Sequence, residues 1–504
     1  MSVPKFNDLS FYSDPSAHKS RYANLVKTFK SKYPNDEIEF FARSPGRVNL
    51  IGDHIDYNYF PVLPMAIEVD VVAAVSTNNN DMIVIANTDS AKFPKETVSL
   101  AEEFTIDREH HTWANYFKCG LIVASKFLQE KAMTKLKGMN ITFSGTVPTG
   151  GGLSSSAAFC VASTLAVLYA NGVEDISKAD LTRITVVSEH YLGLNNGGMD
   201  QCASVYGEQG KALFIQFKPQ LKGTPFEFPV KNLTFVITNS LQVSNKYETA
   251  PIHYNLRVVE MAIAGDLLAK KLNVEGKEGI VKDSNVDTYS LRGVMDGYCG
   301  AWDGEDLDVG VVHLEKMIDV VGKTLTKEGG YTVEQCCEEM GLTPEEFHSR
   351  YLKKIPVKFD VLKLYERALH VYRESLRVLK TLQLLSTVVD ASQFLQTFGS
   401  LMNESQHDLD ILNESSNPKL NEICSIALAN GAYGSRVTGA GWGGSIVHLT
   451  TTENLPKLTK SLEAYYKREF PGITDEEIRE AVIDSKPATG SCLVKLDFSH
   501  ALQG

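Results

Sequence analysis

Short apolar runs separated by turn residues fill much of the first hundred residues. Residues 36–100 contain the runs EIEFFARS, AIEVDVVAAVST, MIVIANT and ETVSL, whose length and composition predict strands of a mixed or antiparallel sheet. Residues 113–132 carry apolar positions at helical spacing, and residues 138–145 (GMNITFSG) return to the strand pattern. The first part of the chain therefore predicts a sheet combined with helices.

The next elements have clear start and stop signals. A glycine-rich turn opens a long apolar helix predicted for residues 153–171, which stops at Gly172. Ser177 and Asp180 form a capping box for a second helix, which is predicted to end at residues 192–193. In the remaining chain, strands ALFIQF and TFVITN alternate with long helices predicted at 255–272, 359–382 and 417–430. The pattern predicts an α+β protein, because it lacks the regular alternation of a doubly wound sheet.

Length alone suggests two to four domains. The 504 residues, 43% of them hydrophobic, can bury a sizeable core. We expect one α+β domain at residues 1–211 and a second at residues 212–504. Residues 273–357 are acidic and Gly- and Glu-rich with weaker periodicity, so we interpret them as an elaboration of the second domain.

Charge and targeting signals exclude several classes of protein. The net charge of -12 argues against a nucleic-acid surface, which needs clustered Lys and Arg. The eight cysteines form no CxxC pair, which predicts reduced and mostly buried thiols. The N-terminal residues form no apolar signal region, and no run approaches 18 apolar residues. We therefore expect a cytoplasmic protein that binds neither membrane nor nucleic acid.

A glycine-serine segment at residues 148–158 (PTGGGLSSSAA) is a candidate phosphate site. Its glycines allow positive φ and close approach of a ligand, and its serines begin an apolar helix whose N–H groups attract anions. A serine hydroxyl there can reach a phosphate-bound Mg²⁺. The alternative is a glycine turn followed by a serine N-cap. The segment is not a P-loop, and the HRD and DFG motifs of protein kinases are missing from the sequence.

A single aspartate follows the Gly-Gly turn of residues 195–201 (NNGGMDQ). Asp200 suits a carboxylate that takes a proton from a hydroxyl group or orients it. The alternative is an Asp that hydrogen-bonds its own turn. Glu189, on the preceding helix, is a candidate Mg²⁺ ligand together with a serine oxygen, although an isolated glutamate is more often a solvated helix residue.

Polar side chains crowd into residues 44–56 (SPGRVNLIGDHID). Arg47, Asp53, His54 and Asp56 supply the donors and acceptors that a polyhydroxylated ligand needs. Arg47 can also neutralise charge on a transferred phosphoryl group. The adjacent Asp and His are a poor metal signature.

A literal GxGxxG occurs at residues 439–444, within GSRVTGAGWGG. A dinucleotide-binding fingerprint follows a strand and opens a helix, whereas here the strand pattern SIVHL comes next. A dehydrogenase is therefore the least favoured function. We expect a glycine loop that closes over a ligand, with Trp442 as a packing residue.

Taken together and in this order, these four segments resemble the motifs of the GHMP small-molecule kinases. SPGRVNLIGDHIDY resembles the signature of the galactokinase branch, which usually has Glu where this chain has Asp53. The resemblance runs from Phe41 to the C-terminal strands, includes MNESQ at 402–406, and is strongest for fungal members, whose insert is similar to residues 273–357. It implies the two-domain GHMP fold with its site in the interdomain cleft, and ATP- and Mg²⁺-dependent phosphorylation of galactose at its anomeric hydroxyl.

The resemblance also implies roles for residues at matching positions. Arg47 and Asp200 match the catalytic pair. The matching sugar contacts are Arg47, Asp53, His54, Asp56, Asn196, Gly198, Asp200 and Tyr254. The matching nucleotide contacts are Gly150, Gly152, Ser154, Ser155, Ser156, Trp113, Ser244, Asn245 and Lys246, and the matching magnesium contacts are Ser155 and Glu189. Because Asp53 is one methylene shorter than Glu, we expect its hydrogen bond to the sugar to be lost, shifted or bridged by water.

Two alternatives stay open beside galactose phosphorylation. Fungal relatives include sensors that bind galactose and ATP and then sequester a repressor of galactose genes, a role that would add a nuclear location. The intact GGGLSSSAA segment and Asp200 favour catalysis, with sensing as an added role. The second alternative is N-acetylgalactosamine kinase, in which the position of Tyr254 resembles Phe.

Overall fold

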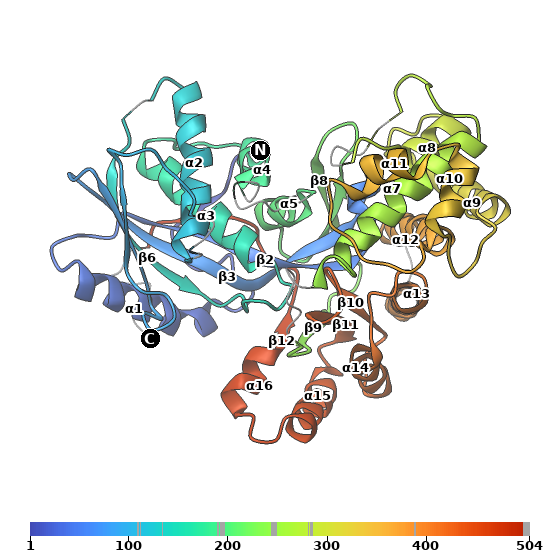
Figure 1. Ribbon diagram of the computed structural model, residues 1–504. Helices are drawn as coiled ribbons and strands as arrows, with labels where there is room; N and C mark the ends of the chain where they lie inside the picture. Colours follow the sequence, from blue (N-terminus) through green and yellow to red (C-terminus); the bar gives the residue numbers. More distant parts are fainter. Residues whose placement is uncertain are drawn as a thin grey trace.

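The computed structural model contains two main β-sheets and a large group of helices (Figure 1). It describes residues 1–107, 110, 112–133, 135–188, 191, 197–242, 249–280, 282, 286–387 and 390–496. No helix in these ranges is both long and apolar enough to cross a membrane. All eight cysteines are unpaired, and all except Cys299 are buried, as predicted.

The first sheet has seven strands and lies on the left of Figure 1. Their spatial order is β1 (Lys5–Phe6), β13 (Cys492–Val494), β2 (Phe40–Ile51), β3 (Leu63–Asn78), β6 (Gly138–Gly145), β4 (Met82–Asn87) and β5 (Glu96–Ser99). The helices of this part are α1 (Pro15–Lys32), α2 (Ala114–Glu130), α3 (Ser155–Ala170), α4 (Lys178–Val186) and α5 (Met199–Tyr206).

Alternation along β3 explains why helices cover both faces of this sheet. Val72 and Ala74 belong to the apolar cluster that contains buried residues of α1, whereas Ala73 and Val75 belong to the core that contains α2 and α3. Successive side chains of a strand point to opposite faces, so a near-continuous apolar run is buried on both sides. Figure 1 shows α1 below the sheet and α2 and α3 above it.

The second sheet has four strands and packs against three helices at the bottom of Figure 1. Its strands, in spatial order, are β10 (Gly434–Thr438), β11 (Ser445–Thr451), β9 (Leu233–Asn239) and β12 (Val482–Ser485). The helices are α14 (Pro418–Ala429), α15 (Leu455–Glu469) and α16 (Asp475–Ala481), and they share a separate apolar core with the sheet. A hairpin of β7 (Lys211–Gln216) and β8 (Lys222–Glu227) joins the first sheet to this part.

The remaining helices form the right-hand part of Figure 1. They are α7 (Tyr254–Lys271), α8 (Leu291–Cys299), α9 (Leu307–Thr324), α10 (Val333–Met340), α11 (Pro344–Phe347), α12 (Leu364–Leu385) and α13 (Ala391–Ile411), with short helical turns η1 (Asp56–Asn58) and η3 (His348–Leu352). Helices α8 to α11 come from the predicted elaboration, residues 273–357. Of these, α8, α9 and α10 pack against α7, α9 also packs against α12, and α11 packs against α10 and η3. The elaboration is therefore largely helical.

Most predicted elements match the structure within a few residues, but one helix start is wrong. The sequence pattern predicts a helix from residue 359, whereas α12 begins at Leu364. Leu362 pairs with Tyr331 through two backbone hydrogen bonds of 2.8 Å, so this segment is extended rather than helical. A bond to a residue 31 positions away is a tertiary contact that local periodicity does not report.

The two halves of the chain are interleaved at the first sheet. Strand β13, near the end of the described chain, pairs with β1 in parallel and with β2 in antiparallel orientation. The α+β class is confirmed. The division into residues 1–211 and 212–504 stays a prediction, with the addition that this late strand lies in the sheet of the first half.

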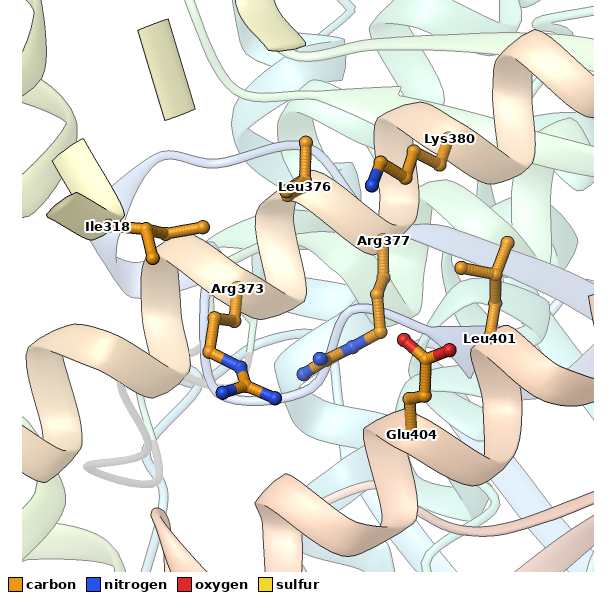
Figure 2. Close-up of a pocket in the computed structure, with 7 residues that line it drawn as sticks. All are labelled: Ile318, Arg373, Leu376, Arg377, Lys380, Leu401 and Glu404. Carbon is orange, nitrogen blue, oxygen red and sulfur yellow. The ribbon is translucent and has the colours of Figure 1, made fainter. Parts of the chain in front are cut away.

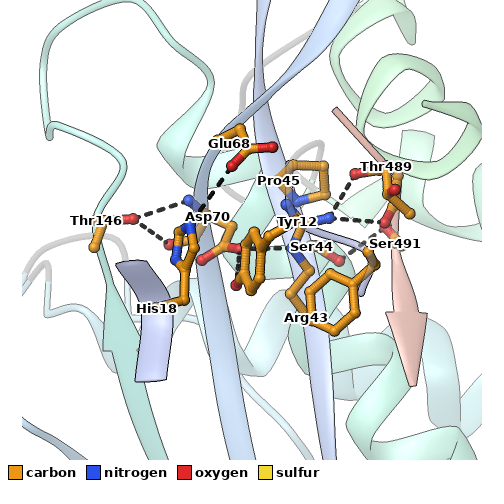
Figure 3. A network of polar contacts seen from close by, with 12 residues as sticks. Tyr12, His18, Arg43, Ser44, Pro45, Glu68, Asp70, Thr146, Thr489 and Ser491 are labelled. Atoms are coloured by element: carbon orange, nitrogen blue, oxygen red, sulfur yellow. Dashed lines mark hydrogen bonds and ion pairs between the residues drawn. The ribbon is translucent and has the colours of Figure 1, made fainter. Parts of the chain in front are cut away.

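A buried charge network fixes this interleaved region (Figure 3). The fully buried Asp70 accepts hydrogen bonds from the Tyr12 hydroxyl and from Nε of Arg43, both at 2.6 Å, and it also pairs with Arg21. Arg43 donates onward to the carbonyl oxygen of Gly490, just before β13. Burial alone would raise the pKa of Asp70, but the two guanidinium groups lower it to about 2. The network therefore ties the N-terminal segment, β2, β3 and the C-terminal segment together.

Candidate functional site

Strand β2 extends from the first sheet toward α12, α13 and β10, and it carries the predicted polar segment of residues 44–56 into the centre of the molecule. Gly46 lies against the glycine-serine segment, where a Cβ atom would come within 2.8 Å of the carbonyl oxygen of Leu153. The next residue, Arg47, donates its backbone N–H to the same oxygen at 3.1 Å. A glycine is required here because only a bare backbone allows this close approach.

The two glycine loops predicted from the sequence face each other. We call residues 148–154 the first glycine loop and residues 439–444 the second. The Ser445 hydroxyl, directly after the second loop, donates to the carbonyl oxygen of Gly151. Gly152 has a φ of +73°, and a Cβ atom on Gly439 would lie 3.3 Å from its carbonyl oxygen. Segments almost 300 residues apart in sequence thus form one backbone-lined site.

Arg47 and Asp200 form the ion pair at the centre of this site. Nε of Arg47 donates to Oδ1 of Asp200 at 2.8 Å, and Nη1 donates to the carbonyl oxygen of Gly152 at 2.8 Å. Asp200 lies in the first turn of α5, after Gly198 with a φ of +93°. The Asp200 side chain keeps 24% exposure whereas Arg47 keeps 7%, so the carboxylate remains accessible to a ligand.

Asp53 is held by three protein donors. Its Oδ1 accepts from the Asn49 amide at 3.1 Å and from the backbone N–H of Gly439 at 3.2 Å, while its Oδ2 accepts from the buried guanidinium of Arg436. Burial raises the pKa of the Asp53 carboxyl, and Arg436 opposes that shift. Asp53 therefore joins β2 to β10 and to the second glycine loop, with one lone pair of Oδ2 left for another partner.

Asp53→Asn should lower the free energy of unfolding by about 1–3 kcal/mol, the range for losing a hydrogen bond to a charged group. The loss should be smaller than the cost of a buried cation without any counter-ion, because Glu374 lies 3.9 Å from Arg436 and still partly neutralises its charge. Urea unfolding of both proteins at pH 7 measures the difference. A variant as stable as the wild type would contradict this assignment of the Asp53 contacts.

His54 has a defined tautomer. Its Nε2 lies 2.7 Å from the carbonyl oxygen of Ala440, and its Nδ1 lies 3.0 Å from the Tyr57 hydroxyl. Burial lowers the pKa of His54 to about 3, so the ring is neutral at physiological pH. A carbonyl only accepts, so Nε2 carries the proton and Nδ1 accepts from Tyr57. His54 therefore contacts the second glycine loop through its proton, with the Tyr254 ring 5.6 Å away.

Asp56 has an environment that disfavours its charged form. Burial, reinforced by the charges of Asp200 and Asp53, raises the pKa of Asp56 from 3.8 to about 6. The backbone of Gly197 lies against it, since a Cβ atom there would come within 2.8 Å of Oδ2. Asp53, Asp56 and Asp200 thus form a group of mutually interacting carboxylates.

This environment gives a stability prediction with a definite sign. Between pH 4 and pH 6 the folded state holds a proton on Asp56 that the unfolded chain releases, so folding loses stability as pH rises through this window. Asp56→Asn removes the titration. The free energy of unfolding of this variant should increasingly exceed that of the wild type between pH 4 and pH 6, and the difference should reach at most about 3 kcal/mol above pH 6. Urea unfolding at pH 4, 5, 6 and 7 checks this, and a pH-independent difference would contradict it.

The N-terminus of α3 provides an anion site next to the ion pair. Ser154 precedes the helix with a φ of +60°, and its side chain does not cap the helix. Its hydroxyl oxygen is buried and, within the described residues, has no hydrogen-bond partner. Ser155 and Ser156 occupy the first turn and remain partly exposed. Free N–H groups, the helix dipole and an unpaired hydroxyl together fit a phosphate group.

Trp113, directly before α2, belongs to a group of aromatic side chains. Its indole N–H donates to the carbonyl oxygen of Pro94 at 2.9 Å, and its ring centre is 5.8 Å from those of Phe93 and Phe159. Five other residues predicted for the site lie outside the described residues, namely Glu189, Asn196, Ser244, Asn245 and Lys246. Tyr254, at the start of α7, has 37% exposure.

Trp442 is a packing residue, as predicted. Its indole N–H donates to the carbonyl oxygen of Glu414 at 2.8 Å, and its ring stacks on His253 with an interplanar angle of 6°. Strand β11 follows the second glycine loop and pairs with β10 in antiparallel orientation. A dinucleotide fingerprint opens a helix, so this geometry argues against the dehydrogenase alternative.

Comparisons with known proteins agree with this geometry. Three family models match: the galactokinase galactose-binding signature at residues 27–77, the GHMP kinases N terminal domain at 115–208 and the GHMP kinases C terminal domain at 388–468. The galactokinase of Candida albicans is 64% identical over 99% of this chain and 100% of its own length. The galactokinase of Saccharomyces cerevisiae is 47% identical over 98% of both chains.

The chain belongs to the galactokinase branch of the GHMP kinase family. Solved structures support the fold of this GHMP kinase. A galactokinase of Lactococcus lactis, complexed with galactose, covers 94% of the chain with a TM-score of 0.65 at 21% identity. A mevalonate kinase of Methanococcus jannaschii covers 90% with a TM-score of 0.54 at 16% identity. The predicted family and its two-part fold are confirmed.

Three residues that support the site of this GHMP kinase from behind are not predicted by its sequence motifs. Arg436 reaches Asp53 from β10, and Glu374 of α12 accepts the backbone N–H of Gly52 at 2.8 Å. His370, one turn earlier, has Nε2 3.1 Å from the carbonyl oxygen of Asp53. The charge at Arg436 inside an otherwise buried strand was an available signal, since a buried charge needs a partner. Glu374 and His370 of α12 gave no such signal in the sequence.

Proposed function

We propose that the chain is a galactokinase that transfers the γ-phosphoryl group of ATP to the C1 hydroxyl of α-D-galactose. The observation that carries this proposal is the Arg47–Asp200 ion pair, located between the polar segment of β2 and the anion site of α3. The identity to galactokinases over the full chain supports it independently.

In this proposal, ATP places its phosphates at the first glycine loop. Backbone N–H groups around Gly150 and Gly152 and the hydroxyls of Ser154, Ser155 and Ser156 hold the phosphates, supported by the positive φ of both glycines. A Cβ atom on Gly150 would meet nothing within 4 Å, which leaves open space beside the loop. The adenine ring lies near Trp113, and the family resemblance implies Ser244, Asn245 and Lys246 as its other contacts.

Galactose lies against the polar segment of β2. Asp56 and Tyr254 supply acceptors and a donor for its hydroxyl groups, and the Gly198 turn approaches it through backbone. His54 packs beside the sugar, because its two ring nitrogens already bind Ala440 and Tyr57. Asp53 contributes through its one remaining lone pair, directly or through a water molecule, since its other positions accept from Asn49, Gly439 and Arg436. This is the shifted contact that the shorter side chain predicts.

Asp200 accepts the proton of the C1 hydroxyl as the C1 oxygen attacks the γ-phosphorus of ATP. The bond from the γ-phosphorus to the β–γ bridging oxygen breaks, and ADP leaves with the electron pair. Arg47 fixes the Asp200 carboxylate through Nε and offsets negative charge on the transferred group. General-base assistance is worth about 10²–10⁴ in rate. Most of the remaining acceleration comes from holding the hydroxyl and the phosphate in line.

Magnesium completes the proposal, with Ser155 and Glu189 as its protein contacts. The partly exposed Ser155 fits a Mg²⁺ that is held mainly by phosphate oxygens and water, because Mg²⁺ uses few protein ligands beside a nucleotide. The described residues contain no cluster of three His, Cys, Asp or Glu that would hold a metal alone. When bound, the ion would neutralise charge on the β- and γ-phosphates.

Removal of the metal should abolish turnover. Ser155→Ala removes one protein contact of Mg²⁺, so the Mg²⁺ concentration needed for half-maximal rate should rise by about tenfold. Ser425→Ala, on the exposed face of α14, is the matched control and should behave as the wild type. Rates in EDTA and across a Mg²⁺ titration measure both effects. An unchanged requirement in Ser155→Ala would remove this residue from the metal site.

The experiment that tests the proposed function is ADP release with ATP, Mg²⁺ and each of galactose, N-acetylgalactosamine and glucose. We expect turnover that is fastest by kcat/KM on galactose. Faster turnover on N-acetylgalactosamine would favour the alternative kinase. Galactose binding that depends on ATP but gives no turnover would favour the sensor.

A sensing role beside catalysis, with a repressor protein as partner, is a further prediction. The intact first glycine loop and the Arg47–Asp200 pair support catalysis over a pure sensor. Sensing as an added role would require a partner that binds only the galactose- and ATP-loaded state, which a pull-down with and without both ligands would detect.

A further inference from the structure

A cavity of about 270 Å³ lies between helices α9, α12 and α13 (Figure 2). Arg373, Leu376, Arg377 and Lys380 of α12 line it at spacings of three and four residues, so they share one side of the helix. Ile318 of α9 faces them. A space of this size suits a small ligand.

Two arginines in this cavity share one buried counter-ion. Nε of Arg373 and Nη1 of Arg377 each lie 2.8 Å from Oδ2 of Asp408, which is fully buried. In the part of the chain that the structure describes, the Nη groups of Arg373 and the Nζ of Lys380 have no hydrogen-bond or ion-pair partner. Glu404 is a second carboxylate at the cavity, and Glu374 is a further counter-ion of Arg377, so three cations face three carboxylates. The unpartnered donors of Arg373 and Lys380, rather than a surplus charge, remain for a ligand.

We propose that this cavity binds a small phosphate-bearing anion, either free phosphate or a small phosphomonoester. Guanidinium groups bind phosphate oxygens through parallel N–H donors, and the Lys380 ammonium adds a point charge. Asp408 holds both guanidinium groups in place before the ligand arrives, which lowers the ordering cost of binding. The apolar side chains of Ile318, Leu376 and Leu401 accommodate the carbon body of an ester.

The cavity is connected to the active site through Arg377. Its Nε and Nη2 donate to Oε2 of Glu374 at 3.1 and 2.8 Å. Oε1 of Glu374 accepts from the backbone N–H of Gly52 and from the Ser405 hydroxyl, both at 2.8 Å. An anion in the cavity draws Arg377 away from Glu374 and weakens the support of Gly52, which precedes Asp53. Occupancy therefore raises the KM for galactose, a consequence that rests on the proposed function.

Calorimetric titration with inorganic phosphate at constant ionic strength tests the site without using activity. We expect saturable binding by the wild-type chain that is at least tenfold weaker in the double variant Arg373→Gln/Lys380→Met. The control Lys323→Met/Arg479→Gln changes the charge equally at exposed cations outside the cavity and should bind as the wild type. Phosphate bound at the first glycine loop would persist in both variants. No saturable binding, or equal binding by the wild type and the cavity variant, would overturn the proposal.

A second titration with glucose 1-phosphate distinguishes the two sources of phosphate. Tighter binding of the ester than of inorganic phosphate, lost in the cavity variant, assigns the cavity to phosphomonoesters, and the reverse order assigns it to free phosphate. In steady-state kinetics, saturating phosphate should raise the galactose KM about fivefold in the wild type and the control, at the lower end of typical allosteric couplings. The cavity variant should show no change. An unchanged KM in the wild type would refute the coupling but leave galactose turnover itself unaffected.

Discussion

Asp200→Asn is expected to reduce kcat by about 10²–10⁴, the range for losing general-base assistance. Asn has nearly the same shape as Asp but cannot accept the proton of the C1 hydroxyl. Its side-chain oxygen can still accept from Nε of Arg47, so the local geometry should be retained. Steady-state ADP release with galactose measures the loss, and the KM for galactose should change far less than kcat.

Two controls separate chemistry from folding in this test. Asp360→Asn, at an exposed carboxylate of the right-hand part, should leave kcat unchanged. Calorimetry should show that Asp200→Asn still binds galactose, because the contacts of Asp56 and Tyr254 remain. A variant that keeps more than a tenth of the wild-type kcat would show that Asp200 only orients the hydroxyl group.

Asp70→Asn is expected to lower the free energy of unfolding by about 3–5 kcal/mol, the cost of breaking a buried ion pair. The substitution leaves the fully buried Arg43 and the mostly buried Arg21 without their shared carboxylate. The difference should be constant above about pH 5 and shrink as pH falls toward 2, because the carboxylate stabilises the fold only while it is charged.

Urea unfolding at pH 7, 5, 4 and 3 measures this dependence. Asp360→Asn is again the matched control and should stay within about 0.5 kcal/mol of the wild type. A loss of less than about 1 kcal/mol for Asp70→Asn would mean that Arg21 and Arg43 reach solvent or other acceptors when the carboxylate is removed.

Local patterns predicted the elements of this fold well, because the dominant signals are local. The long apolar run that forms β3 and the apolar helix α3 after three glycines are encoded within short windows. The predicted start of α12 was wrong because Tyr331 pairs with the segment before this helix. The position of β13 in the first sheet had no local signal in the sequence. Pairing between distant segments is decided by the whole core.

In the site too, local motifs could be predicted whereas contacts between distant segments could not. Arg47, Asp200 and the two glycine loops could be predicted as candidates because each motif has its own chemistry, and the structure brings them together. The use of Asp53 could not be predicted from residue type. An aspartate in a polar segment suits a ligand, yet here Arg436, from a strand almost 400 residues later, occupies one of its oxygens. This contact depends on the packing of β10 beside β2, which residue type does not report.

The most direct test of the central claim is the fate of the γ-phosphoryl group. The chain would be incubated with galactose, Mg²⁺ and ATP labelled at the γ-phosphate, and the products would be separated and examined by phosphorus NMR. We expect label on the C1 oxygen of α-galactose in amounts equal to the ADP formed. Label in inorganic phosphate alone, on another hydroxyl group, or still in ATP while galactose is bound, would contradict it.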